Sequence, residues 1–432
     1  MAKIIETKLG LIEGVEKDTH YIYKGIPYAK PPVGELRFHA PVAVESWKGV
    51  FKADRFSNRA IQRGQNEGDF YYKEFFDDPQ FVTPMSEDCL YLNIWTPKEI
   101  NEKLPVAIYI HGGGFFNGHS FEKEMDGEAY AKRNVILVTI NYRLGMIGFF
   151  AHPDLTKRDG SSGNYGLLDQ IEAIKWVKNN INAFGGDPEN ITIFGQSAGG
   201  RSVEILCALP CTKGLFQRAI MQSSGGYIDN DLGTLPRETI EKCAKGFLRT
   251  RFLSVDKLMK MEPEKFVALN YKFARYVAFK VKHGYVPGSP SVCPELYPYT
   301  TNHAVDNQLM HDIDYMIGGT KNDIFVSPKG TKSIEANEMM QGVTKFASKM
   351  SKTYNCYVYY FAHDLPGDDS GAFHSGELWY MFGTLGRCFR PFTDADYKLS
   401  DEMIDFWTNF MKTGDPGFAK YTDQEKFIKV FE

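Results

Sequence analysis

The sequence lacks the features that mark nucleic-acid-binding, membrane-spanning and disulfide-rich proteins. No run of lysine and arginine occurs, and the net charge is −4 over 432 residues, so a nucleic-acid partner is not expected. The first residues hold no apolar secretion signal, and no window has the hydropathy of a membrane span. The seven cysteines are odd in number and form no Cys-x-x-Cys pair, which favours free thiols. We therefore expect a cytoplasmic protein without a membrane span.

Metal ligands and domain linkers are missing as well. The histidines do not cluster at metal-binding spacing, and Cys207 and Cys211 have no second pair of ligands near them in the sequence. No internal repeat or low-complexity linker divides the chain, and 43% of the residues are hydrophobic. We therefore predict a single domain over residues 1–432 that uses neither a metal nor a cofactor.

What the chain does contain is a series of short apolar runs separated by helical patterns. The runs are residues 106–110, 135–140, 191–194, 219–222, 315–318 and 357–361. Apolar residues also recur every three or four positions between 171 and 184 and between 403 and 411. Buried strands separated by helices predict an α/β fold with a mostly parallel central sheet flanked by helices. In such sheets the reactive site lies at the carboxyl ends of the strands.

Two segments, residues 63–85 and about 227–310, fit this pattern poorly. Both are rich in aromatic side chains: Phe70, Tyr71, Tyr72, Phe75, Phe76 and Phe81 in the first, and Phe266, Tyr271, Phe273, Tyr276 and Phe279 in the second. Aromatic residues at helical spacing are usually core residues. We nevertheless predict that the two segments form a cap or lid over the active edge of the sheet.

The motif Gly195-Gln-Ser197-Ala-Gly199 indicates a nucleophilic serine. It follows the predicted strand 191–194 and precedes a stretch that can be helical, which is the strand–turn–helix context of a nucleophile elbow. The small flanking residues allow a strained, sharp turn that exposes the serine hydroxyl. A chance occurrence of the motif is the alternative, and the surrounding pattern argues against it.

An acyl-transfer serine needs donors for an oxyanion and a general base. Residues 111–114, His-Gly-Gly-Gly, follow the predicted strand 106–110, so the backbone amides of Gly113, Gly114 and Ala198 are candidate donors, although a flexible glycine turn would look similar. In this class of sheet the base follows the nucleophile and the acid in the chain. His374, in a glycine-flanked loop after strand 357–361, is the preferred base, and His363 is the alternative.

The acid that orients the base is less well marked by pattern. Asp323 follows the predicted strand at 314–318 and therefore lies at its carboxyl end. Many other acidic residues lie between Ser197 and His374, so the pattern alone leaves this position open.

Several motifs, in order along nearly the whole chain, resemble the type B carboxylesterases, a family that includes cholinesterases and bacterial para-nitrobenzyl esterases. Glu-Asp-Cys-Leu-Tyr-Leu-Asn at 87–93 is similar to its second signature, and residues 194–200 are similar to its active-site signature. Further matches are residues 23–29, 31–38, 164–170, 184–188, 371–378 and 408–416. The resemblance implies an α/β-hydrolase fold.

The resemblance also implies roles for individual residues. It makes Ser197 the nucleophile, His374 the base and Asp323 the acid, with Gly113, Gly114 and Ala198 as the oxyanion hole. It further implies a structural salt bridge between Arg37 and Glu87, which composition does not reveal.

The chain departs from the family pattern at four points. The acid is usually Glu, whereas Asp323 is one methylene shorter, and the usual disulfide partner of Cys89 is replaced near Ala60, so Cys89 is expected to be a free thiol. The interval between Asp323 and His374 is short, which implies a reduced helical cap and an open site. Segment 63–85 contains no tryptophan and offers no obvious cation–π platform for a choline headgroup.

Together these features predict a serine hydrolase that cleaves carboxylic esters through an acyl-enzyme. We expect a small-molecule ester substrate, broad specificity for short to medium acyl or aryl esters, and a monomer or small homo-oligomer. The alternatives are a non-catalytic cholinesterase-like binding protein, which typically lacks the serine, and an amide or lactone hydrolase that uses the same triad. The physiological ester does not follow from the sequence.

Overall fold

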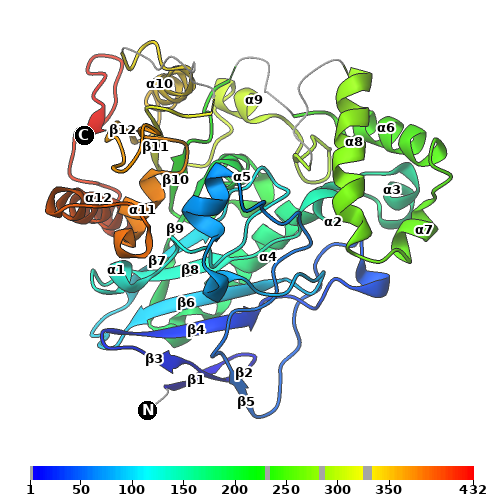
Figure 1. Cartoon of the computed structure of the whole chain (residues 1–432), viewed down its shortest axis with the longest axis horizontal. Coiled ribbons are helices and arrows are strands. Elements are labelled where there is room, and N and C mark those ends of the chain that lie inside the picture. Colours follow the sequence, from blue (N-terminus) through cyan, green and yellow to red (C-terminus); the bar gives the residue numbers. More distant parts are fainter. Residues whose placement is uncertain (1–2, 229–233, 282–287, 325–332) are drawn as a thin grey trace.

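The computed structural model describes residues 3–228, 234–281, 288–324 and 333–432 (Figure 1). Its central element is a sheet whose strands, in spatial order, are β13 (Lys429–Phe431), β12 (Cys356–Phe361), β11 (Asp314–Thr320), β10 (Arg218–Gln222), β9 (Gly186–Gln196), β7 (Leu104–Ile110), β8 (Ile136–Ile140), β6 (Tyr91–Pro97), β4 (His20–Pro27) and β3 (Val15–Glu16). The strands from β13 to β8 pair in parallel, whereas β6, β4 and β3 pair antiparallel. The predicted α/β fold with a mostly parallel sheet is confirmed.

A small second sheet contains the N-terminal hairpin. Strands β1 (Ile4–Thr7) and β2 (Gly10–Glu13) pair antiparallel, and β5 (Val50–Lys52) adds to β2 in parallel.

Helices cover both faces of the central sheet because its strands are apolar on both sides. The helices are α1 (Glu128–Ala131), α2 (Gly145–Phe149), α3 (Pro153–Asp159), α4 (Tyr165–Asn180), α5 (Ala198–Leu206), α6 (Arg237–Arg249), α7 (Val255–Met259), α8 (Lys265–Val281), α9 (Thr301–Asp306), α10 (Glu338–Met350), α11 (Glu377–Phe382) and α12 (Asp394–Thr413). Within the described ranges, no helix combines the length and the hydropathy that a membrane span needs.

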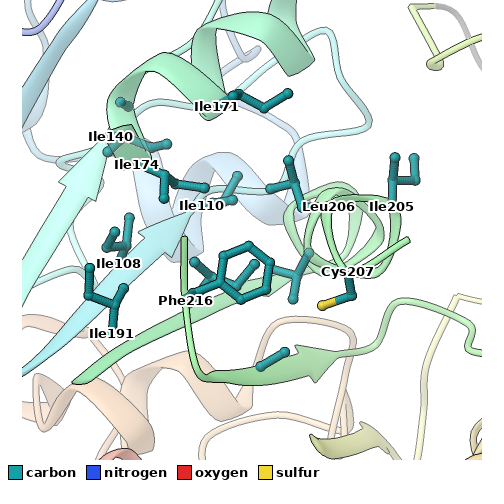
Figure 2. Packing of buried hydrophobic residues seen from close by; sticks show 14 of the residues in the cluster. Ile108, Ile110, Ile140, Ile171, Ile174, Ile191, Ile205, Leu206, Cys207 and Phe216 are labelled. Atoms are coloured by element: carbon teal, nitrogen blue, oxygen red, sulfur yellow. The ribbon is translucent and has the colours of Figure 1, made fainter. Parts of the chain in front are cut away.

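Strand β7 shows how the two faces are separated. Val106, Ile108 and Ile110 point into the core that contains α4, α5 and α10, whereas Ala107 and Tyr109 belong to the core under α1, α11 and α12. Figure 2 shows the first of these cores, in which Ile108 and Ile110 lie near helix residues such as Ile171 and Leu206. Each fully buried aliphatic side chain of this kind contributes about 1.5–3 kcal/mol through the hydrophobic effect.

A third apolar cluster joins α2 and α3 to α6, α7 and α8. Phe266 and Phe273 of α8 are buried in it together with Phe38 and Phe150. Figure 1 shows α3, α6, α7 and α8 grouped at the right of the view, with α11 and α12 at the left. Helices α6, α7 and α8 come from the predicted cap segment 227–310, part of which lies outside the described residues. Whether the two predicted segments act as a cap stays a prediction.

Candidate active site

Ser197 occupies a strained turn between a strand and a helix. Strand β9 ends at Gln196 and helix α5 begins at Ala198, and Ser197 between them has φ 58° and ψ −124°. A positive φ is unfavourable for a serine, so the surrounding structure must hold it. The Ser197 amide donates to the carbonyl oxygen of Gln222 at the end of β10, at 2.8 Å. This geometry is that of a nucleophile elbow.

Glycines allow the loop after β7 to approach this elbow closely. A Cβ on Gly199 would lie 2.0 Å from the carbonyl oxygen of Ile110, and a Cβ on Gly112 would lie 2.8 Å from that of Gln196. Both distances are shorter than any side chain tolerates, so the elbow and the loop fit together only with glycine at these positions.

The predicted oxyanion residues lie around the same point. Gly113 and Gly114 have φ values of 95° and 64°, which favour glycine, and both line a pocket of about 410 Å³ together with Ser197 and His374. Ala198 is buried as the first residue of α5. The structure therefore places these predicted site residues at one edge of the sheet.

Asp323 contacts His374, whose ring lines this pocket. His374 Nδ1 lies 2.5 Å from Asp323 Oδ1, and both side chains are buried. The other carboxylate oxygen accepts hydrogen bonds from Ser223 Oγ at 2.6 Å and from the Thr320 amide at 3.1 Å. With its two oxygens engaged by different partners, the carboxylate is held in one orientation toward the imidazole.

Electrostatics keep Asp323 ionised and make His374 a stronger base. Burial opposes ionisation of Asp323, but His374 and the hydrogen bonds from Ser223 and Thr320 hold its pKa below the ordinary value of 3.8. Burial by itself lowers the pKa of His374, but the charge and hydrogen bond of Asp323 outweigh it and hold that pKa above 6.5. The two shifts have a common cause in the short Asp323–His374 contact.

The second nitrogen of His374 faces a residue that the motif analysis did not single out. Gln196 Nε2 lies 3.2 Å from His374 Nε2. Gln196 Nε2 also lies 3.4 Å from His374 Nδ1, so the amide packs against both ring nitrogens. The ionised carboxylate of Asp323 accepts from Nδ1, which places the ring proton there and leaves Nε2 as the acceptor. This is the tautomer in which Nε2 can take a proton.

The alternatives weighed from the sequence have other partners. His363 Nε2 lies 2.8 Å from Asp396 Oδ1. Among nearby acids, Asp364 pairs with Lys321 at 2.5 Å and Asp368 pairs with Arg390 at 2.9 Å. None of these three residues lines the pocket that contains Ser197.

Two further buried groups around the triad escaped sequence reasoning. Ser223 follows β10, and Glu377 begins α11, where burial raises its pKa to about 7. Glu377 Oε1 accepts from Gln222 Nε2 at 3.4 Å. For Ser223, the sequence did contain an indication: the run Gln222-Ser-Ser stands at the end of a buried strand. Polar residues at that position lie at the edge of the sheet where the reactive site is expected.

Arg37 and Glu87 form a buried ion pair at a distance from this pocket. Arg37 Nε donates to Glu87 Oε1 at 2.6 Å, and Arg37 Nη1 donates to the carbonyl oxygens of Leu258 and Met261, each at 2.7 Å. The guanidinium therefore ties the segment that precedes β6 to the C-terminal end of α7 and the residues just after it.

Segment 63–85 supplies one wall of the pocket. Tyr71, Phe75 and Phe76 line it, and Tyr71 Oη donates to the backbone carbonyl of His374 at 3.1 Å. Glu74 of the same segment is buried and accepts from Arg390 Nε at 3.1 Å. The wall is thus attached directly to the loop that carries the base and to the chain beyond α11.

Comparison with known proteins agrees with this geometry. Residues 1–338 and 328–429 match the sequence model of a family described as "Carboxylesterase family". The chain belongs to the carboxylesterase family. It is 32% identical to para-nitrobenzyl esterase of Bacillus subtilis (strain 168) over 96% of this chain and 90% of that protein. It is 31% identical to bile salt-activated lipase of Bos taurus over 97% of this chain and 80% of that protein.

Solved carboxylesterase structures share the whole fold. A thermophilic PNB esterase superposes with a TM-score of 0.84 at 31% identity, covering 99% of this chain and 96% of its own. The resemblance to the family that the motifs indicated is therefore confirmed, and so is the α/β-hydrolase fold.

Proposed function

We propose that this protein hydrolyses carboxylic esters through a covalent acyl-enzyme on Ser197, with His374 as general base and Asp323 as the acid that orients it. The observation that carries the proposal is the shared pocket: a strained Ser197 lies beside His374, whose Nδ1 is 2.5 Å from a buried aspartate. Family membership and the esterase relatives support the same reaction class.

In the first half-reaction, Ser197 Oγ attacks the ester carbonyl carbon while His374 Nε2 takes the hydroxyl proton. The negative charge that develops on the carbonyl oxygen is stabilised by the backbone amides of Gly113, Gly114 and Ala198. Asp323 stabilises the imidazolium and keeps its proton on Nδ1. When the tetrahedral intermediate collapses, His374 returns its proton to the departing alcohol and the acyl-enzyme remains.

In the second half-reaction, His374 Nε2 takes a proton from a water molecule that attacks the acyl carbon. The resulting oxyanion uses the same three amides. Collapse releases the carboxylic acid, and the proton returns from His374 to Ser197 Oγ. Each proton that leaves Ser197 or the attacking water therefore passes through His374 Nε2.

The finer parts of the proposal rest on separate observations. Segment 63–85 acts as part of a cap because Tyr71, Phe75 and Phe76 line the pocket, and the broad preference for short to medium acyl or aryl esters fits that aromatic wall. A cytoplasmic location fits the seven cysteines, all within the described ranges and all free. Hydrolysis of an amide or a lactone would use the same groups. Comparing kcat/KM for an ester, an amide and a lactone of similar size tests whether esters are preferred.

Replacing the nucleophile tests the proposal. Ser197→Ala is expected to lower kcat for 4-nitrophenyl butyrate by about 10⁴-fold or more, because the elbow holds one hydroxyl and no neighbour replaces it. Covalent labelling by a fluorophosphonate should disappear in parallel. Ser224→Ala, which removes a hydroxyl beyond the pocket, is the matched control and should keep both signals. Unchanged labelling of the Ser197→Ala variant would overturn the assignment.

A further inference from the structure

Two glutamates line the same pocket as Ser197. Glu122 and Glu124 lie between the glycine loop and helix α1, and Glu124 is only 1% exposed. Together with Phe75 and Phe76 they form the part of the pocket that faces segment 63–85. The catalytic steps proposed above use neither carboxyl.

The nearby cations bind other groups and form no ion pair with these two carboxyls among the described residues. Lys123 Nζ pairs with Asp77 at 2.6 Å, and Arg387 pairs with Asp126. Arg59 Nε donates to the carbonyl oxygen of Thr83 at 3.0 Å. Over the part of the chain that the structure describes, neither Glu122 nor Glu124 takes part in an ion pair. Glu122 Oε1 has one backbone donor, the amide of His119 at 3.0 Å.

Apart from the contact between the two carboxyls themselves, two buried polar atoms in this wall have no hydrogen-bond partner among the described residues. They are Glu124 Oε2 and the phenolic oxygen of Tyr109, whose side chain is 1% exposed and also lines the pocket. A buried polar atom without a partner is costly, and native proteins rarely keep one unless something else supplies the partner. Two such atoms in one wall point to a ligand that donates hydrogen bonds.

The charge of the pair suits a cationic donor. Burial raises the pKa of Glu122 and of Glu124, and the two carboxyls interact closely enough to share a proton. Burial therefore disfavours ionisation of both carboxyls, and an ammonium group bound between them would favour it by offsetting the charge that forms. Arg59 and Arg387 are the cations that act on it from outside.

Other ligands fit the wall less well. A quaternary ammonium has no N–H to give to Glu124 or Tyr109, and it depends on aromatic faces for its binding. A calcium ion takes six to eight oxygen ligands, and no group of three or more metal-binding side chains occurs in the described residues. A primary ammonium has three donors and a single charge, which match the two carboxyls and the phenol.

We propose that Glu122, Glu124 and Tyr109 form a subsite for a primary ammonium group carried on one arm of the ester substrate. The inference rests on the proposed function, because it identifies the class of ester that the pocket selects: amino-functionalised esters rather than plain alkyl esters.

Isosteric ester pairs test the subsite. Methyl 6-aminohexanoate is compared with methyl heptanoate, and 6-aminohexyl acetate with heptyl acetate, so that the ammonium lies on the acyl arm in one pair and on the alcohol arm in the other. We expect kcat/KM to favour the amino ester by about tenfold or more in one pair, as for one hydrogen bond to a charged group. Equal or lower kcat/KM for both amino esters would overturn the proposal.

Charge-removing variants locate the effect. Glu124→Gln and Glu122→Gln keep the shape of the side chains and should abolish most of the preference while turnover of heptyl acetate continues. Glu128→Gln removes one exposed negative charge from α1, outside this pocket, and should leave the preference intact. If both pocket variants still prefer the amino ester, other groups bind the ammonium and the proposal is overturned.

Binding of a simple amine separates the subsite from catalysis. Titration calorimetry with hexylammonium and hexyltrimethylammonium is expected to show tighter binding of the primary amine, weakened by Glu124→Gln. If no ester is hydrolysed but this binding pattern holds, the proposed function fails and the subsite stands. If heptyl acetate is hydrolysed and hexylammonium binds no better than hexyltrimethylammonium, the subsite fails and the proposed function stands.

Discussion

At the scale of single residues, the length of Asp323 bears on how the proposed triad is assembled. An aspartate reaches less far than the glutamate usual in this family, yet Asp323 Oδ1 lies 2.5 Å from His374 Nδ1. The short side chain reaches the imidazole because its other oxygen is bound to Ser223 and Thr320, which fixes the carboxylate at the end of β11.

Asp323→Asn should lower kcat by several orders of magnitude, because the imidazole loses its counter-charge and the partner that selects its tautomer. Asp323→Glu should retain more activity than the asparagine variant. Asp364→Asn, which removes an acid paired with Lys321 outside the pocket, should stay near the parent protein. Steady-state hydrolysis of 4-nitrophenyl butyrate measures all three, and near-normal activity of Asp323→Asn would rule out this acid.

The pH dependence of kcat/KM follows from the same pair. His374 must be neutral to take a proton, so activity should fall as pH decreases through its pKa. Because Asp323 holds that pKa above 6.5, the acidic limb should lie above pH 6.5. In Asp323→Asn the raising charge is gone, and the limb of the residual activity should move to lower pH. If the acidic limb of Asp323→Asn lies at the same pH as that of the parent protein, the limb belongs to a group other than His374.

At the scale of elements, the sequence predicted those features of the site that are determined by residues adjacent in the chain. The elbow at Ser197 and the glycine loop at 112–114 depend on residues adjacent in the chain, and both were predicted. Ser223 and Gln196 were not, because their contacts with Asp323 and His374 depend on the lateral order β9-β10-β11, which places distant strand ends side by side. Glu124 was not predicted either, because it lies in the connection between β7 and α1 rather than at a strand end. Asp323 was predicted in part. The sequence showed that it follows a strand, but its contact with His374 depends on how the strands align in the sheet.

A buried ion pair between Glu74 and Arg390 is one of the contacts that hold the wall segment 63–85. Removing the guanidinium in Arg390→Met leaves Glu74 buried without its partner and should lower the free energy of unfolding by about 3–5 kcal/mol. The double variant Arg390→Met/Glu74→Leu should recover much of this loss. Arg133→Met, which breaks pairs with the exposed Asp401 and Asp405, should cost about 1 kcal/mol or less in urea unfolding. Equal losses for Arg390→Met and Arg133→Met would contradict this account.

At the scale of the whole molecule, the structure holds together without covalent cross-links. All seven cysteines are free, and Cys211 is the exposed one, whereas Cys388 is half-buried and the others are buried. Burial raises the pKa of Cys356 to about 12 and that of Cys388 to about 11, which suppresses thiolate formation. Stability therefore rests on the three apolar clusters and on the buried ion pairs.

Thiol titration checks this arrangement. Ellman's reagent should modify Cys211 first in the native protein and all seven thiols after denaturation. Cys211→Ser should remove the fast phase, and a reducing agent should leave Tm unchanged. Fewer than seven thiols in the denatured, unreduced protein would reveal a disulfide and contradict the structure.

The hydrogen bonds that join neighbouring strand ends also bear on how the protein folds. The Ser197 amide is bound to the end of β10, and Ser223 is bound to Asp323 after β11, although these segments are far apart in the chain. Such long-range contacts form late, because closing large loops delays the pairing of parallel strands. During refolding, helical circular dichroism should therefore return before esterase activity. The recovery of turnover would therefore report the moment at which the neighbouring parallel strands have all paired.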